Sequence, residues 1–181
     1  MWKLCKLAGL FVAACVCHWG FATLFLYCGL NVNFMLVFAI AFCTVAQLEI
    51  GYPMAFLCGL FLDFFGAKLF GNNAFSFTMV ACIVYALRER FDFNSFLPQM
   101  VTVFVLTCAA GVLNSVLLIQ FTSSSLWPGT SSLLGGAFVG AVLSPFVFAV
   151  VRFVWVDLAA DERANFFWSI PASPSGSSEI R

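Results

Sequence analysis

Long apolar stretches, separated by short polar interruptions, make up most of the chain. Continuous apolar runs of about 20 residues are typical of membrane-spanning helices, whereas strands of outer-membrane barrels alternate polar and apolar residues over roughly ten positions. The chain shows the first pattern, so its predicted fold class is all-α, a polytopic membrane bundle of about six transmembrane helices. The interruptions place these helices at residues 7–30, 34–48, 53–67, 74–87, 97–121 and 133–156.

The segments at 34–48, 53–67 and 74–87 are short for a membrane crossing. About 20 residues are needed to cross roughly 30 Å of hydrocarbon, but short segments can recruit flanking residues, thin the bilayer locally, or enter and return on one side. Pro53 is expected in the first turn of its helix, where proline is tolerated. If neither 34–48 nor 53–67 spans, four crossings remain and the two termini still lie on the same side.

The basic residues predict the orientation of the bundle. With the N-terminus in the cytoplasm, every Lys and Arg except Lys68 falls on or near the cytoplasmic face, in agreement with the positive-inside rule. Arg88, Arg90 and Arg152 mark this face within the chain. Both termini are therefore predicted to be cytoplasmic.

The two ends of the chain differ in character. The N-terminal stretch resembles a signal peptide, but its apolar run continues to residue 30, which favours a retained first helix over cleavage. Residues 1–156 are predicted to form a single transmembrane bundle. Residues 157–181 turn polar and end in a segment rich in Ser and Pro, so they are expected to be a disordered cytoplasmic tail.

Composition narrows the possible functions. Hydrophobic residues make up 63% of the chain and charged residues 9%, compared with about 25% charged residues in a soluble domain. The formal net charge is zero, so no basic surface suggests a nucleic-acid partner. The sequence contains no Walker loop, nucleophile elbow or His-Glu-x-x-His motif. A non-enzymatic protein without cofactor or metal is predicted, and the lone His18 and the eight cysteines are interpreted as packing residues.

Asp63 is the most informative single residue, because it lies inside an apolar segment. An acidic residue near the middle of a bilayer costs roughly 2.5–3.5 kcal/mol on insertion scales. Gly59 and Gly66 share a helix face with Asp63, which indicates a tight interface there. Two interpretations stay open: a partner-binding or substrate site, and a packing acid bonded to a neighbouring hydroxyl or amide. Asn114, with the adjacent Ser115, is a candidate partner for Asp63.

The last segment carries two further features. Gly136 and Gly140 form a small-xxx-small pattern, which either packs against another helix of the same chain or forms a dimer contact. The first alternative is the more common one. Pro145 lies in the middle of the segment and is predicted to kink it, because proline removes one backbone hydrogen bond.

The region from residue 47 to residue 92 resembles the rod shape-determining protein MreD family. That family has a Gly-Leu-x-x-Asp motif, then a short turn that ends in Gly, then a helix that runs into basic residues. The matching residues are Gly59, Leu60, Asp63, Gly71, Tyr85, Arg88 and Arg90. Pro145 followed by Arg152 is similar to the last helix of the family. The chain departs from the family at Asn31-Val-Asn33, where Arg-Pro before an acidic or amide residue is frequent.

The resemblance implies a non-enzymatic scaffold in the inner (cytoplasmic) membrane of a bacterium. Members of the family act in the cell-elongation machinery that maintains rod shape. They work with an MreC-like protein and, through the complex, with MreB filaments, a SEDS glycosyltransferase and a penicillin-binding protein. The expected role is to couple the cytoskeletal filaments to peptidoglycan synthesis through contacts between membrane helices.

An alternative comes from a second similarity. The MreD family resembles the substrate-binding membrane subunits of energy-coupling-factor vitamin transporters, which are also small six-helix proteins. This alternative predicts a small-ligand pocket near the outer face, for which Asp63, Lys68, Asn72 and Asn73 are candidate residues. The short outer loops offer few other binding groups.

Overall fold

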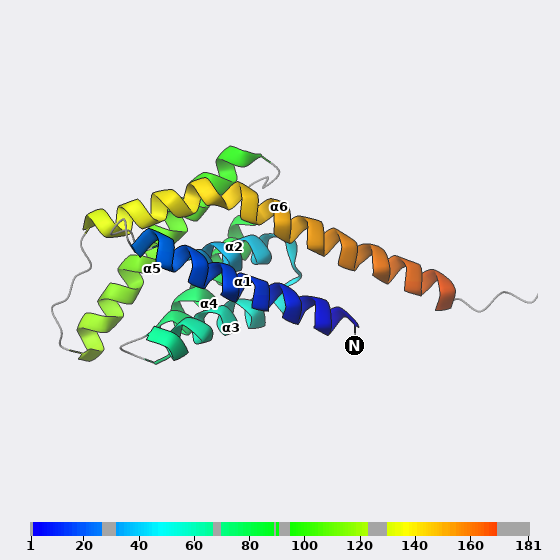
Figure 1. Cartoon of the computed structure of the whole chain (residues 1–181), viewed down its shortest axis with the longest axis horizontal. Helices are drawn as coiled ribbons and strands as arrows, with labels where there is room; N and C mark the ends of the chain where they lie inside the picture. The colour runs from blue at the N-terminus through cyan, green and yellow to red at the C-terminus, as the bar shows by residue number, and fades with distance from the viewer. Residues whose placement is uncertain are drawn as a thin grey trace, which may run out of the picture.

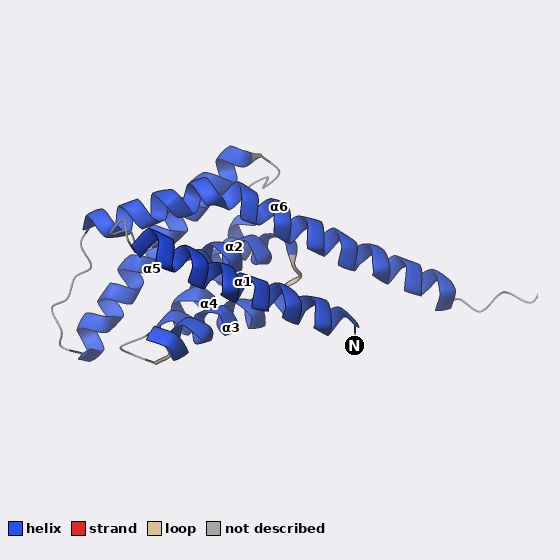
Figure 2. Cartoon of the chain, viewed as in Figure 1, coloured by secondary structure: helices blue, strands red, loops and turns tan. Residues whose placement is uncertain are grey.

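The computed structural model describes residues 2–26, 32–66, 70–88, 90, 95–122 and 130–169. Within these ranges the chain forms six helices and no strand, which confirms the predicted all-α class (Figure 2). The helices are α1 (Trp2–Leu26), α2 (Phe34–Val45), α3 (Leu48–Gly66), α4 (Asn72–Arg88), α5 (Phe96–Thr122) and α6 (Thr130–Ser169).

Four of the helices are long and apolar enough to cross a membrane, so the chain is a multi-pass membrane protein. These spans are Cys5–Phe25, Leu48–Gly66, Phe96–Phe121 and Ser131–Val156. α2 has 12 residues and α4 has 17, and both fall below the length of a full crossing. The expected shortness of segments 34–48 and 74–87 is therefore confirmed.

The third predicted segment begins earlier than expected. α3 starts at Leu48 and has 19 residues, which is long enough to span, and Pro53 lies inside the helix and not in its first turn. The chain breaks at Ala46, which has extended backbone geometry, so the stretch from Glu49 to Pro53 joins α3. Pro53 is tolerated because the hydrogen bond it removes would have reached the carbonyl of Glu49, an exposed residue in the first turn.

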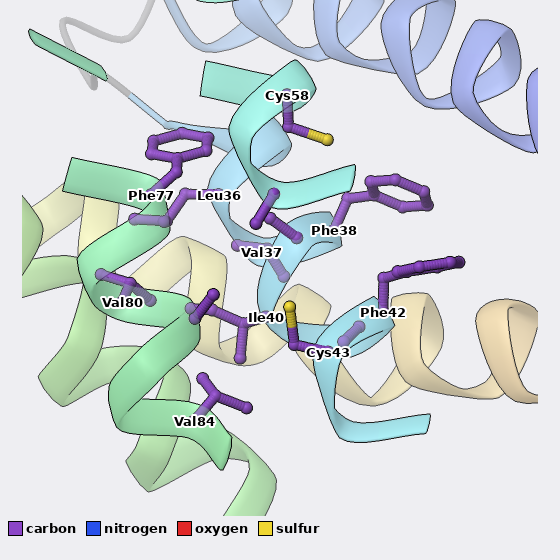
Figure 3. Packing of buried hydrophobic residues seen from close by; sticks show 14 of the residues in the cluster. Leu36, Val37, Phe38, Ile40, Phe42, Cys43, Cys58, Phe77, Val80 and Val84 are labelled. Carbon is purple, nitrogen blue, oxygen red and sulfur yellow. The ribbon is translucent and has the colours of Figure 1, made fainter. Parts of the chain in front are cut away.

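α2 is the centre of the bundle and packs against the other five helices (Figure 1). Its residues from Phe34 to Thr44 are all buried. Figure 3 shows α2 side chains such as Leu36 and Ile40 lying against Phe77, Val80 and Val84 of α4. A helix of this length covers only about 18 Å, and it is tolerated at membrane depth because protein surrounds it.

Both ends of α2 have hydrogen-bond partners. At its start, the side-chain oxygen of Asn33 accepts a hydrogen bond from the backbone N–H of Leu36 at 3.2 Å. At its end, Arg88 of α4 donates from Nη1 to the Ala46 carbonyl at 2.7 Å, and Tyr85 donates to the Gln47 carbonyl at 3.2 Å. Carbonyls at a helix C-terminus lack partners within the helix, so Arg88 of α4 stabilises this end of α2. The Gln47 carbonyl also accepts the backbone N–H of Gly51 at 2.9 Å, so Tyr85 bonds to the start of α3.

α6 packs along α2 and α5 through a stripe of small and apolar residues. Gly136 and Gly140 are buried, and a Cβ added at Gly140 would lie 3.2 Å from Cγ2 of Val37 in α2. The contact at Gly140 lies within the chain, which supports the packing interpretation of the small-xxx-small pattern. The buried members of the stripe are Ala137, Ala141, Ser144, Val147, Phe148 and Val151.

Pro145 lies inside α6, and Figure 1 shows this helix changing direction along its length. Proline has no N–H to bond to the carbonyl of Ala141, four residues earlier. The hydroxyl of Ser144, which is fully buried, donates to that carbonyl at 2.7 Å. A side chain thus replaces the backbone donor, as is common where proline occurs in membrane helices.

The apolar span of α6 ends at Val156, where the boundary between bundle and tail was predicted, but the helix itself continues beyond it, so the expected disorder does not hold for the first part of the tail. α6 continues to Ser169, so residues 157–169 are helical. This stretch contains several alanines together with leucine, glutamate and arginine, which are strong helix formers and extend a helix that is already nucleated. The rest of the expected tail, residues 170–181, lies outside the described part of the chain.

Candidate functional site

Asp63 lies in the last turn of α3 and is 4% exposed. One carboxylate oxygen accepts hydrogen bonds from the backbone N–H and the side-chain amide of Asn73, both at 3.0 Å. The other oxygen accepts from the backbone N–H of Ala74 at 2.9 Å. All these donors belong to the first turn of α4, so Asp63 acts as a capping residue supplied by the preceding helix.

This geometry explains how an acidic residue is accommodated inside the bundle. The first N–H groups of a helix have no partner within that helix, and the helix dipole makes its N-terminus favourable for an anion. Asp63 satisfies two of these N–H groups in α4 and gains charge-assisted hydrogen bonds. The polar acid and the polar helix end thus compensate each other.

Gly59 and Gly71 allow α4 to reach Asp63. A Cβ added at Gly59 would lie 2.5 Å from the Cα of Ala74 and 2.6 Å from the carbonyl oxygen of Asn73, so α3 and α4 touch through their backbones here. Gly71 has φ +92° and forms the turn immediately before α4. That left-handed conformation is favourable for glycine and strained for most other residues.

Gly66 takes no part in the described contact between α3 and α4, and its assignment to a partner-binding or packing face stays a prediction. It is exposed at the end of α3, and no atom of a described residue lies within 4 Å of a Cβ built on it. Gly66 follows the helix periodicity of Gly59 and Asp63, but among the described residues the first turn of α4 contacts Gly59 and Asp63 and not Gly66. Helix periodicity in the sequence therefore shows which face of α3 meets a neighbour, but it does not show how far along α3 the neighbouring helix extends.

Hydrogen bonds extend from Asp63 through α4 to α5. The side-chain oxygen of Asn73 accepts from Nδ2 of Asn114 at 2.9 Å, and Oδ1 of Asn114 accepts from the hydroxyl of Ser76 at 2.5 Å. Asn72 donates from Nδ2 to the backbone carbonyl of Asn114 at 3.5 Å. We call Asp63, Asn72, Asn73, Ser76 and Asn114 the polar cluster; it ties α3, α4 and α5 together.

Asn114, which was predicted as a candidate partner of Asp63, is linked to it through Asn73 and not by a direct hydrogen bond. Ser115 does not join the polar cluster, because its hydroxyl donates to the Gly111 carbonyl in its own helix at 2.8 Å. The sequence analysis did not identify Ser76 as a member of the polar cluster, nor Asn73 as the residue that bonds to both Asp63 and Asn114. The signal was the pair Asn72-Asn73 directly after Gly71, because Asn is common at helix starts.

The other predicted site residues lie elsewhere. Gly136, Gly140 and Pro145 are in α6, where they serve packing and local geometry. Arg88 ends α4 and Arg90 is exposed just beyond it, at the opposite end of α4 from the polar cluster. Lys68 lies outside the described residues.

His18 is half-buried in α1, and its Nδ1 atom makes no hydrogen bond to a described residue. The described residues contain no group of three His, Cys, Asp or Glu side chains that could hold a metal ion. The donors around Asp63 are amide groups, which fix the position of a carboxylate but do not activate a nucleophile. This arrangement is suited to holding helices together.

No protein-family model matches the chain, and no curated protein or solved structure matches it. Function must therefore be inferred from the residues, their geometry and the resemblance of the region around Asp63 to a known family.

Replacing Asn114 with alanine is expected to destabilise the bundle by about 1–2 kcal/mol, because Asn73 and Ser76 each lose a buried hydrogen bond. The change is measured as a lower melting temperature of the purified protein in detergent. Val112→Ala is the matched control, because Val112 lies on α5 and is 43% exposed. An Asn114→Ala variant that melts like the control would contradict the proposed link between α4 and α5.

Proposed function

We propose that the chain is a non-enzymatic scaffold of the bacterial cell-elongation machinery, located in the inner membrane. In this role it would dock an MreC-like protein and help to couple MreB filaments to peptidoglycan synthesis by a SEDS glycosyltransferase and a penicillin-binding protein. The proposal rests on the resemblance of the region around Gly59 and Asp63 to the MreD family.

The proposal is supported by the structural roles of the residues that resemble the family. Gly59 allows the backbones of α3 and α4 to touch, and Asp63 caps α4. Gly71 forms the turn between the two helices, and Arg88 bonds to the end of α2. Each of these residues holds helices in place. A scaffold that binds partners through its helix surfaces requires such a fixed helix arrangement.

The distribution of basic residues supports a cytoplasmic position for both termini. Arg88 contacts the C-terminal end of α2, and Trp155 of α6 packs edge-on against Phe42 at the same end, with ring centroids 5.7 Å apart. Arg88 and Arg152 therefore lie at one end of the bundle, the end favoured for the cytoplasm by the positive-inside rule. Figure 1 shows the start of α1 and the end of α6 on the same side.

The scaffold proposal is tested in the bacterial host. Depletion of the protein is expected to convert rod-shaped cells to rounded ones, and a tagged copy is expected to retain an MreC-like protein after mild detergent extraction. A complementing copy with Phe64→Leu serves as control, because Phe64 is 76% exposed and makes little contact with the core. Unchanged cell shape together with the absence of an MreC-like protein from the purified material would reject the proposal.

One observation favours the alternative, a substrate-binding subunit of a vitamin transporter. Asp63, Asn72 and Asn73 come together, and Oδ1 of Asn72 is buried without a hydrogen bond to any described residue. The other groups of the polar cluster bond to one another, which leaves fewer of them for a ligand. In this case a vitamin-sized molecule should copurify and raise the melting temperature; a ligand-free protein that is indifferent to candidate vitamins would reject this alternative.

A further inference from the structure

A groove lies between the N-terminal turns of α5 and the middle of α6, two helices that pack side by side. Its volume is about 420 Å³, within the usual range for small-molecule sites of roughly 300–1,000 Å³. The residues that line it and carry the argument are Phe96, Gln99, Ala149, Arg152, Phe153 and Val156.

The groove combines one cationic group with a largely apolar wall. Arg152 supplies a planar guanidinium, which has enough N–H groups to donate to a phosphate as well as to a neighbouring residue. The amide of Gln99, which is 4% exposed, lies in the same wall. Several of the remaining lining residues are aromatic or aliphatic, so the groove provides a polar site next to an apolar channel.

The groove lies close to the ends of two apolar spans, where the lipid headgroups are expected. Phe96 begins the apolar span of α5, and Arg152 lies about one helical turn before the end of the apolar span Ser131–Val156 of α6. This is the end of the bundle that also carries Arg88. Arg side chains close to the ends of membrane helices reach toward the headgroup region.

We propose that this groove binds an anionic phospholipid. The phosphate of the lipid pairs with Arg152, and the upper part of an acyl chain lies along Phe96, Phe153 and Val156. Basic pockets between membrane helices on the cytoplasmic side are a known way of binding anionic headgroups. The proposal does not depend on the scaffold role, because it uses a different face and different residues from the polar cluster.

The apolar rim distinguishes a lipid from a soluble anion as the occupant. Phe153 is 78% exposed, Phe96 68% and Val156 62%. On membrane-spanning helices these side chains face the lipid phase, where an acyl chain covers them and a free phosphate ion does not. Charge at Arg152 together with this apolar rim matches a molecule that has an anionic head and a hydrocarbon tail.

The test uses the full-length protein in detergent, with phosphatidylglycerol and phosphatidylcholine of identical acyl chains added in parallel. Phosphatidylglycerol is expected to raise the melting temperature more and to remain bound in native mass spectrometry. Arg152→Gln should weaken the binding of phosphatidylglycerol about tenfold, and Arg152→Lys should weaken it less, because it keeps the charge. Arg90→Gln, which removes an exposed charge outside the groove, should bind like the wild type.

A second variant tests the shape of the groove without removing its charge. Ala149 is exposed and lines the groove, so Ala149→Trp fills it with little disturbance of the core and should also reduce phosphatidylglycerol binding. Equal binding of the two lipids by the wild type would overturn the proposal. So would unchanged lipid binding in both Arg152→Gln and Ala149→Trp, or displacement of the lipid by millimolar inorganic phosphate, which would identify a site for soluble anions.

Discussion

Replacing Asp63 with leucine is expected to lower the free energy of unfolding by about 3–5 kcal/mol, because a buried, charge-bonded acceptor is lost. The change leaves the backbone N–H groups of Asn73 and Ala74 and the side-chain amide of Asn73 without their acceptor, and Ala74 is buried. In a membrane bundle, water is scarce around such groups, so their desolvation is not compensated. The expected result is a large fall in melting temperature, with loss of the contact between α3 and α4.

Two companion variants define this prediction. Phe64→Leu changes the adjacent residue, which is 76% exposed, and should melt close to the wild type. Asp63→Asn keeps one acceptor oxygen but turns the other into an NH2 group, which would face either Asn73 or the Ala74 N–H, so an intermediate loss is expected. If Asp63→Leu melts like Phe64→Leu, capping of α4 by Asp63 does not stabilise the bundle.

Replacing Gly59 with alanine is expected to destabilise the protein by about 1–3 kcal/mol through overpacking. The added Cβ would lie 2.5 Å from the Cα and 2.7 Å from the backbone nitrogen of Ala74. Backbone atoms cannot rotate out of the way as a flexible side chain can, so α4 must move as a whole. This movement also lengthens the hydrogen bonds between Asp63 and the first turn of α4.

Gly66→Ala provides the matched control for Gly59. Both glycines lie in α3, but a Cβ at Gly66 meets nothing within 4 Å. Alanine is favoured over glycine in helices by up to about 1 kcal/mol, so Gly66→Ala is expected to be neutral or slightly stabilising. Unfolding of the two variants in the same detergent measures the difference directly. Equal stability of Gly59→Ala and Gly66→Ala would contradict the close backbone contact at Gly59.

The longest helices follow from the apolar pattern, but the central position of α2 does not. Every residue from Phe34 to Val45 except Thr44 is apolar, which in a soluble protein indicates a helix buried on all sides. In a membrane protein the surface that faces lipid is equally apolar, so hydropathy does not separate a central helix from a peripheral one. α1 is also largely apolar, yet Val12, Val16 and Trp19 in it are exposed.

The polar cluster was predictable in part. The spacing of Gly59 and Asp63 indicates a close contact, and the cost of an acid in an apolar segment indicates that Asp63 has partners. The identity of those partners depends on the turn at Gly71, which places the first turn of α4 against Asp63. Sequence spacing does not define that three-dimensional path, and for the same reason it does not show that the described contact with α4 involves Gly59 and Asp63 but not Gly66.

Asp63 lies close in sequence to its hydrogen-bond donors, and this affects the order in which the helices insert into the membrane. Asp63 and Asn73 are ten residues apart, whereas Asn73 and Asn114 are 41 apart. The hydrogen bonds that Asp63 accepts from the first turn of α4 are therefore expected to form as soon as α3 and α4 pack together, before α5 has been synthesised. The two helices are expected to insert as one unit, and α5 then joins a hairpin that already presents Asn73 and Ser76 to it.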